Sequence, residues 1–163
     1  MILSLSKFSV YKAALRGCLF LNPSVLIVTE NEVTEDSDMN ATDNQIIISA
    51  NGQELTATLA QNSSAEALRE LLQEGPLTIS MRDYGSMEKV GDIGTSLPTN
   101  DEQITTEAGD LILYMGSAFV IYYAPNSWNF TRLGKIDNIT AKELKDFLGN
   151  GNVEITISFL TAF

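Results

Sequence analysis

The chain has 163 residues and a net charge of −11, from 10 Lys and Arg against 21 Asp and Glu, and 44% of its residues are hydrophobic. The apolar content suffices for a buried core, and an acidic surface repels phosphate backbones, so we expect a folded domain that does not bind nucleic acid. The chain has no histidine and a single cysteine, Cys18, which excludes imidazole-based catalysis, imidazole metal ligands and an intrachain disulfide. We therefore expect no metal and no other cofactor.

The first 43 residues are interpreted as an extension that precedes the domain. Residues 1–28 are apolar with three basic side chains, and the segment that follows is polar and acidic. This order is typical of an export signal or membrane anchor, but Arg16 and Pro23 interrupt the apolar run before it reaches the length of a spanning helix. Three interpretations stay open: an unstructured extension upstream of a start at Met39 in a cytoplasmic protein, a degenerate signal or lipid anchor of an exported one, and a structured element.

The domain, residues 44–163, begins with a predicted β-hairpin. An Asn-Gly pair at 51–52 separates residues 45–50 from residues 53–59, and both turn residues can adopt the positive φ of a type I′ turn. Apolar and polar residues alternate in the second strand, which predicts one buried face and one exposed face.

A helix is predicted directly after the hairpin. Ser63 and Glu66 have the spacing of a capping box, in which the serine accepts a bond from a free amide and the glutamate bonds back. An apolar stripe continues from Ala65 to Leu72, and a Gly-Pro pair at 75–76 ends the helix.

The middle of the chain combines a strand with a glycine-punctuated segment. Residues 77–81 alternate and predict a strand, whereas residues 83–106 are interpreted as loops. The acidic side chains Asp83, Glu88 and Asp92 lack calcium-loop spacing, so we expect them to be solvated and to form neither a metal site nor a catalytic carboxylate pair.

The C-terminal half of the domain predicts more strands and a second helix. Residues 111–114 and 118–123 are apolar throughout and indicate two strands buried on both faces. Residues 132–136 predict a short strand, residues 140–143 a second capping box, and residues 153–159 a final alternating strand. About eight short strands and two helices favour a mostly β, closed barrel with one helix capping each opening, since closure removes exposed sheet edges.

Four segments in this order resemble the bacterial cyclophilin-like domain family. They are residues 83–90 (DYGSMEKV), 109–114 (GDLILY), 117–124 (SAFVIYYA) and 133–136 (LGKI). The resemblance extends over about residues 46–160 and implies the closed, eight-stranded cyclophilin-like barrel. No activity is established for this bacterial family.

The resemblance also suggests where a site would lie. Active cyclophilins isomerise X-Pro peptide bonds with an arginine, a carpet of apolar and aromatic residues, a tryptophan and a histidine. Here Val120 takes the place of the pocket phenylalanine and Trp128 that of the pocket tryptophan, whereas the histidine is absent. Arg82 and Arg132 are the two candidates for the arginine.

The first functional hypothesis is a module that binds a peptide or a small molecule on the barrel surface. Aromatic residues would gather there beside an arginine able to bind a carbonyl or carboxylate, and Trp128 and Arg132 should share one concave pocket. The alternative is that these aromatics simply complete the core. The candidate ligand-binding residues are Tyr84, Glu88, Val120, Tyr122, Asn126, Trp128 and Arg132.

Two further hypotheses remain. A weak prolyl isomerase would use Arg82 or Arg132 as a cation over the prolyl nitrogen in a dry pocket, which requires no histidine, nucleophile or general base. A protein-interaction or envelope accessory domain would instead present a flat apolar patch. The sequence indicates no particular oligomeric state.

Overall fold

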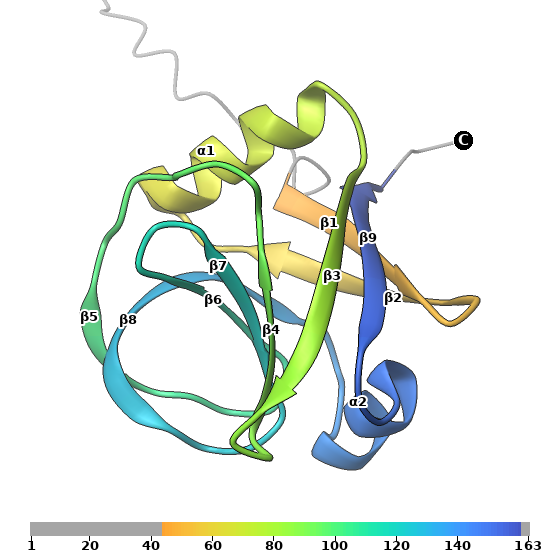
Figure 1. Cartoon of the computed structure of the whole chain (residues 1–163). Coiled ribbons are helices and arrows are strands. Elements are labelled where there is room, and N and C mark those ends of the chain that lie inside the picture. The colour runs from red at the N-terminus through yellow and green to blue at the C-terminus, as the bar shows by residue number, and fades with distance from the viewer. Residues whose placement is uncertain (1–43, 161–163) are drawn as a thin grey trace, which may run out of the picture. The chain divides into compact units, whose positions relative to one another are not determined.

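A computed structural model describes residues 44–160 (Figure 1), so the predictions made for the N-terminal extension lie outside the described residues. Within this range, neither helix has the length and hydrophobicity needed to cross a bilayer. The elements are β1 (Gln45–Ala50), β2 (Gln53–Leu59), α1 (Ser63–Gln73), β3 (Leu77–Tyr84), β4 (Glu88–Asp92), β5 (Glu102–Thr105), β6 (Asp110–Tyr114), β7 (Ala118–Tyr122), β8 (Ser127–Ile136), α2 (Ala141–Leu148) and β9 (Val153–Phe159).

Eight of the strands close into an antiparallel barrel. They follow the order β2-β1-β9-β3-β4-β7-β6-β8, and β8 pairs with β2 to complete the ring. Gly134 of β8 lies at this seam, paired with Leu59 of β2. Only glycine fits there, because a side chain would clash with the carbonyl oxygen of Thr58 in β2. The predicted mostly β, closed eight-stranded barrel is confirmed.

A ninth strand, β5, lies outside the ring. It pairs with residues 127–130 of β8, whereas the rest of β8 pairs with β6 and β2. We call residues 102–105 together with residues 127–130 the flap. The prediction placed β5 in a loop and began β8 only at Arg132, because Ile104 is the single apolar residue of β5 and gives no alternating pattern.

Side chains of the barrel strands alternate between the interior and the outer surface. The interior holds the main core, which the apolar faces of α1 and α2 join from opposite ends of the barrel, as Figure 1 shows. The two predicted capping helices are thus found. A second, smaller apolar cluster lies on the outer surface of β6, β7 and β8 and consists of Ile112, Val120, Tyr122 and Phe130.

Several local predictions are confirmed. Asn51 and Gly52 both have positive φ, at 51° and 74°, and join β1 to β2 in the predicted register. Thr140 and Glu143 form the reciprocal capping box of α2. The strands β6 and β7 are buried on both faces over most of their length.

The cap of α1 is one residue earlier than predicted. Asn62, not Ser63, precedes the helix in an extended conformation, and its side-chain oxygen accepts a bond of 2.9 Å from the Ala65 amide. The Asn62 side-chain amide also donates to the Arg132 carbonyl oxygen of β8 at 2.8 Å. Ser63 is already helical, so it cannot take the cap position.

The acidic segment from residue 83 is strand rather than loop. Gly85 and Ser86, both with positive φ, reverse the chain between β3 and β4. The polar composition of β4 hid the strand, because Lys89 faces the interior and Glu88 is also buried. Glu88 is therefore not the solvated side chain that the sequence predicted.

Candidate functional site

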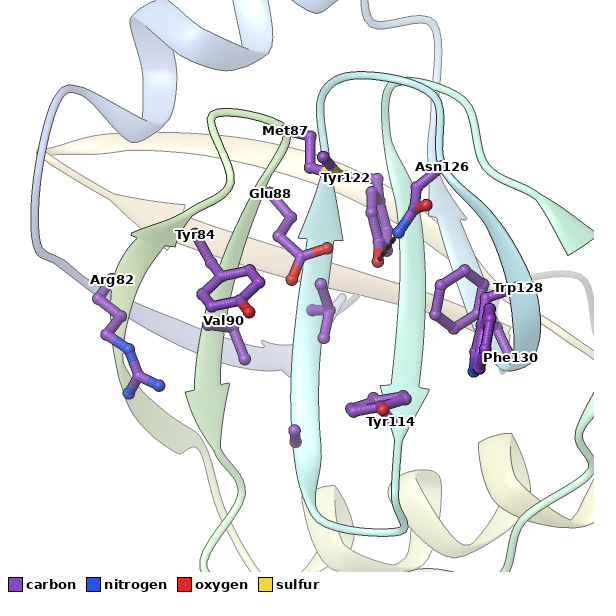
Figure 2. Close-up of a pocket in the computed structure, with 12 residues that line it drawn as sticks. Arg82, Tyr84, Met87, Glu88, Val90, Tyr114, Tyr122, Asn126, Trp128 and Phe130 are labelled. Atoms are coloured by element: carbon purple, nitrogen blue, oxygen red, sulfur yellow. Dashed lines mark hydrogen bonds between the residues drawn. The ribbon is translucent and has the colours of Figure 1, made fainter.

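A concave pocket lies on the outer surface of the barrel, over β3, β4, β6 and β7 and against the flap (Figure 2). Its volume is about 490 Å³, within the size range of small-molecule sites. Val90, Ala118 and Val120 form an apolar floor. The remaining lining residues are Arg82, Tyr84, Met87, Glu88, Tyr114, Tyr122, Asn126, Trp128 and Phe130.

Strand register brings these side chains together. Residues separated by two positions share a face of a strand, and directly paired residues on neighbouring strands lie side by side on that face. The even-numbered residues of β3, β4 and β7 therefore point outward in rows. Two such rows are Arg82–Val90–Val120 and Tyr84–Glu88–Tyr122.

Aromatic side chains surround the floor. Tyr84 and Trp128 are each 62% exposed, and Tyr114 is also exposed. Phe130 is buried beneath them, with its ring centroid 6.2 Å from that of Tyr114 and 5.6 Å from that of Tyr122. The flap supplies Trp128 and Phe130, so this outer strand pair forms one wall of the pocket.

Three polar side chains lie next to one another in the pocket, those of Glu88, Tyr122 and Asn126 (Figure 2). The Asn126 amide donates to the Tyr122 hydroxyl at 3.2 Å, and Glu88 of β4 is the direct neighbour of Tyr122 of β7 in the sheet. Glu88 is only 8% exposed, and among residues 44–160 it forms no ion pair. Burial raises the pKa of Glu88, and the neighbouring Tyr122 hydroxyl only partly opposes this. Burial also raises the pKa of Tyr122, so its hydroxyl stays protonated.

The two candidate arginines occupy different environments. Arg82 lies at the β3 border of the pocket and is exposed. Arg132 does not line the pocket, because its guanidinium lies 2.8 Å from a carboxylate oxygen of Asp110, which is fully buried. The expectation that Trp128 and Arg132 share one pocket is therefore wrong.

A second polar cluster lies behind the pocket, on the inner side of the β3–β4 hairpin. The Lys89 ammonium lies 2.8 Å from Asp83 Oδ1 and donates to the Gly151 carbonyl oxygen at 2.5 Å. Asp83 also accepts bonds from the Gly151 amide and the Tyr123 hydroxyl. The bond from Lys89 is the main cause of the lowered pKa of Asp83. This cluster fastens the hairpin to the loop between α2 and β9.

Comparison with known proteins identifies the family. Residues 48–158 match the sequence profile of the Cyclophilin-like family. The chain belongs to the Cyclophilin-like family. No curated protein matches it. Its structure is similar to the solution structure of a hypothetical protein from Archaeoglobus fulgidus, with a TM-score of 0.55 and 14% identity over 76% of this chain and 99% of that one. At this identity the likeness concerns the fold alone.

In this cyclophilin-like barrel, six of the seven candidate ligand-binding residues line one pocket, and Arg132 does not. The sequence interpretation missed part of the floor and wall. Alternation would have found Val90, two positions from Glu88, once β4 was recognised as a strand. It would have found Phe130, two positions from Trp128, once β8 was begun at Ser127. The missed lining residues are Met87, Val90, Tyr114, Ala118 and Phe130.

The three acidic residues singled out from the sequence do not converge. Among residues 44–160 no three acidic side chains gather where they could hold a metal ion. Asp83 bonds to Lys89 behind the pocket, Glu88 lies in the pocket, and Asp92 accepts a bond from the Gly94 amide.

Proposed function

We propose that this cyclophilin-like domain binds a peptide or a small molecule in the outer-surface pocket. The observation that carries the proposal is the exposure of Tyr84 and Trp128 at its border. Aromatic side chains that completed the core would be buried, as Tyr122 and Tyr123 are. When a ligand covers large aromatic groups that were exposed to water beside a concave apolar floor, the burial of their apolar surface favours binding.

The polar groups of the pocket supply orientation for such a ligand. Glu88 offers a carboxylate, Asn126 an amide and Arg82 a guanidinium, all around the apolar floor. A largely apolar pocket with a few convergent polar groups is the usual form of a small-molecule site. A flat apolar patch, expected of a pure protein-interaction domain, fits this concave surface less well.

Filling the floor tests the proposal. Ala118→Met should place a longer side chain in the pocket and weaken binding by about tenfold or more, because the ligand loses its contact with the floor. Ligands would first be found with a fragment library of short peptides, small acids and small amines, by NMR chemical-shift changes in the pocket. Ala141→Met on the exposed surface of α2 is the matched control and should bind normally. Equal affinity in both variants would contradict the proposal.

A second candidate function is prolyl isomerisation by Arg82. It is favoured by one observation: Arg82 borders the pocket, whereas Arg132 is held by Asp110. A cation over the prolyl nitrogen would reduce the double-bond character of the peptide bond. If the activity exists, Arg82→Ala should return the isomerisation of a proline peptide to its uncatalysed rate, and Arg132→Lys should not. A wild-type rate equal to the buffer background would remove this candidate.

A further inference from the structure

The acidic side chain of Glu88 lies in the depth of the pocket. Glu88 is more than nine-tenths buried and forms no ion pair with any residue in the described part of the chain. By contrast, the other two buried charged side chains between residues 44 and 160, Lys89 and Asp110, each have an oppositely charged partner at 2.8 Å. A carboxylate withdrawn from water without a counter-charge is unfavourable, so such a group either takes up a proton or binds a cation that supplies the charge.

The surroundings of Glu88 leave acceptor capacity on its carboxylate. Because Asn126 donates to the Tyr122 oxygen, the Tyr122 hydrogen can be directed to the neighbouring Glu88. An ionised carboxylate has about four acceptor positions and no donor, so one bond from Tyr122 would use only part of this capacity. An ammonium group has donors and no acceptor, and it therefore complements Glu88, whereas a carboxylate ligand would place acceptor against acceptor.

The border of the pocket also suits a cation. Tyr84, Tyr114 and Trp128 are the exposed aromatic residues of the lining, and aromatic faces attract cations. Figure 2 shows the Arg82 guanidinium at the opposite border from Trp128, with Tyr84 between it and Glu88. Since Arg82 is exposed, water and salt screen its charge more than that of buried Glu88.

We propose that the pocket binds an organic cation, with its ammonium group on Glu88 and its apolar body on Val120 among the exposed aromatic side chains. This inference rests on the proposed function and names the chemical class of its ligand. The ammonium can belong to a small amine or to a lysine of a peptide, since both present the same group.

The inference implies a pH dependence. Cation binding requires ionised Glu88, so affinity should fall as pH decreases through the pKa of Glu88. Because burial raises that pKa above the ordinary value of 4.5, the loss should begin at a higher pH than an exposed glutamate would give. The other ionisable groups that face Glu88 are Tyr122, which stays protonated, and the exposed Tyr84 and Arg82.

Trp128 provides the readout, because it is the only tryptophan of the chain and lines the pocket. Fluorescence titrations would compare phenethylammonium with phenethyl alcohol and phenylacetate, a neutral and an anionic analogue of similar shape. We expect the ammonium to bind about tenfold or more tightly than the alcohol, and phenylacetate to bind most weakly. The affinities of acetyl-Ala-Lys-Ala-amide and acetyl-Ala-Gln-Ala-amide would also be compared. Tighter binding of the lysine peptide would indicate a peptide lysine as the source of the ammonium, and equally weak binding of both peptides would indicate a small amine.

Glu88→Gln tests the residue. It keeps the shape of the side chain and removes its charge, so ammonium affinity should fall to that of the alcohol while alcohol binding persists. Asp92→Asn removes the same charge from an exposed position on the same strand and should change ammonium affinity less than about twofold.

The outcomes separate the two proposals. The proposal of a cationic ligand would be overturned if Glu88→Gln left ammonium binding unchanged, or if phenylacetate bound more tightly than phenethylammonium through Arg82. Either result would still leave the pocket as a binding site. If neither these probes nor the fragment library altered Trp128 fluorescence or the pocket NMR signals, the proposed function itself would fall.

Discussion

Two ion pairs of the barrel differ in which partner is buried. Lys89 is 1% exposed and its partner Asp83 is 39% exposed, whereas Asp110 is fully buried and its partner Arg132 is partly exposed. In each pair, removing the exposed partner leaves a charge in the interior, and removing the buried partner leaves a charge that water can solvate. The two members of each pair should therefore respond differently to substitution.

For the Lys89 pair, Asp83→Ala should be the more damaging change. We expect it to lower the free energy of unfolding by about 3–5 kcal/mol, because the Lys89 ammonium is then buried without a counter-charge. Lys89→Met should lower it by less than about half as much, since the remaining carboxylate is partly solvated. Urea denaturation measures both. Asp146→Ala, in an exposed pair with Lys142, is the control and should change stability by less than about 0.5 kcal/mol.

The acid limb of the stability curve gives an independent check of this pair. The pKa of Asp83 is lower in the folded state than its ordinary value of 3.8, so the folded state binds fewer protons there than the unfolded state. Its contribution to stability is present above pH 3.8 and is lost as pH falls through the lowered pKa. Lys89→Met should flatten this part of the curve; an unchanged acid limb would contradict the assigned cause.

At single positions, the sequence interpretation named three of the aromatic residues that line the pocket, Tyr84, Tyr122 and Trp128, and missed Tyr114 and Phe130. The choice between Arg82 and Arg132 depends on strand register and on the burial of Asp110, and neither is local information. Glu88 was a candidate, but its burial was not predicted for the same reason, because it depends on the position of β4 between β3 and β7.

Among the elements, α1 is attached to the barrel through its cap. Asn62 satisfies the Ala65 amide of the helix and also bonds to the Arg132 carbonyl oxygen in β8. A single side chain thus both begins the helix and fixes its position over the barrel.

Substitution at the start of α1 should distinguish Asn62 from Ser63. Asn62→Ala should lower the free energy of unfolding by about 1–2 kcal/mol, since it removes a helix cap and a bond to β8. Ser63→Ala should cost less than about 0.5 kcal/mol, because Ser63 is exposed and already helical. Thermal unfolding of both variants provides the comparison. A larger loss of stability in Ser63→Ala than in Asn62→Ala would indicate that Ser63 is the N-cap, as the sequence predicted.

The elements that could be predicted are those whose signals are local. The Asn51-Gly52 turn, the Thr140–Glu143 capping box and the alternation of β9 each lie within a few residues of sequence. By contrast, β4 lies between β3 and the distant β7, and β5 is a strand because the distant β8 pairs with it. Both strands are mostly polar, and in β4 the inward-facing residue Lys89 forms an ion pair with Asp83, so neither strand has the alternating pattern that indicates a strand.

At the scale of the whole molecule, the barrel depends on a close approach of β2 and β8. Gly134 allows it, because a Cβ there would overlap the Thr58 carbonyl oxygen and lie 3.1 Å from the Leu59 Cα. Backbone atoms cannot move aside as a flexible side chain can. The closed ring was predicted from the number of strands, but the residue that permits closure was not.

Gly134→Ala should therefore weaken the seam. We expect a loss of about 2–3 kcal/mol or more in the free energy of unfolding, as for overpacking in a core. Hydrogen exchange should accelerate at the β2 amides that face β8, around residues 57–59. Lys135→Ala, on the neighbouring residue, should leave this exchange slow. Uniform acceleration over all strands of the described barrel would indicate general destabilisation rather than opening of the seam.

The alternation of side chains in β4 and β7 has an evolutionary consequence. Val120 and Tyr122 face the pocket, whereas Phe119 and Ile121, between them, fill the barrel. Substitutions at the outward positions can change what is recognised while the scaffold stays intact. An insertion or deletion of one residue would exchange the two sets and spoil both. Relatives should thus diverge in specificity through point substitutions in these strands, while gaps in their alignments fall in the connecting turns.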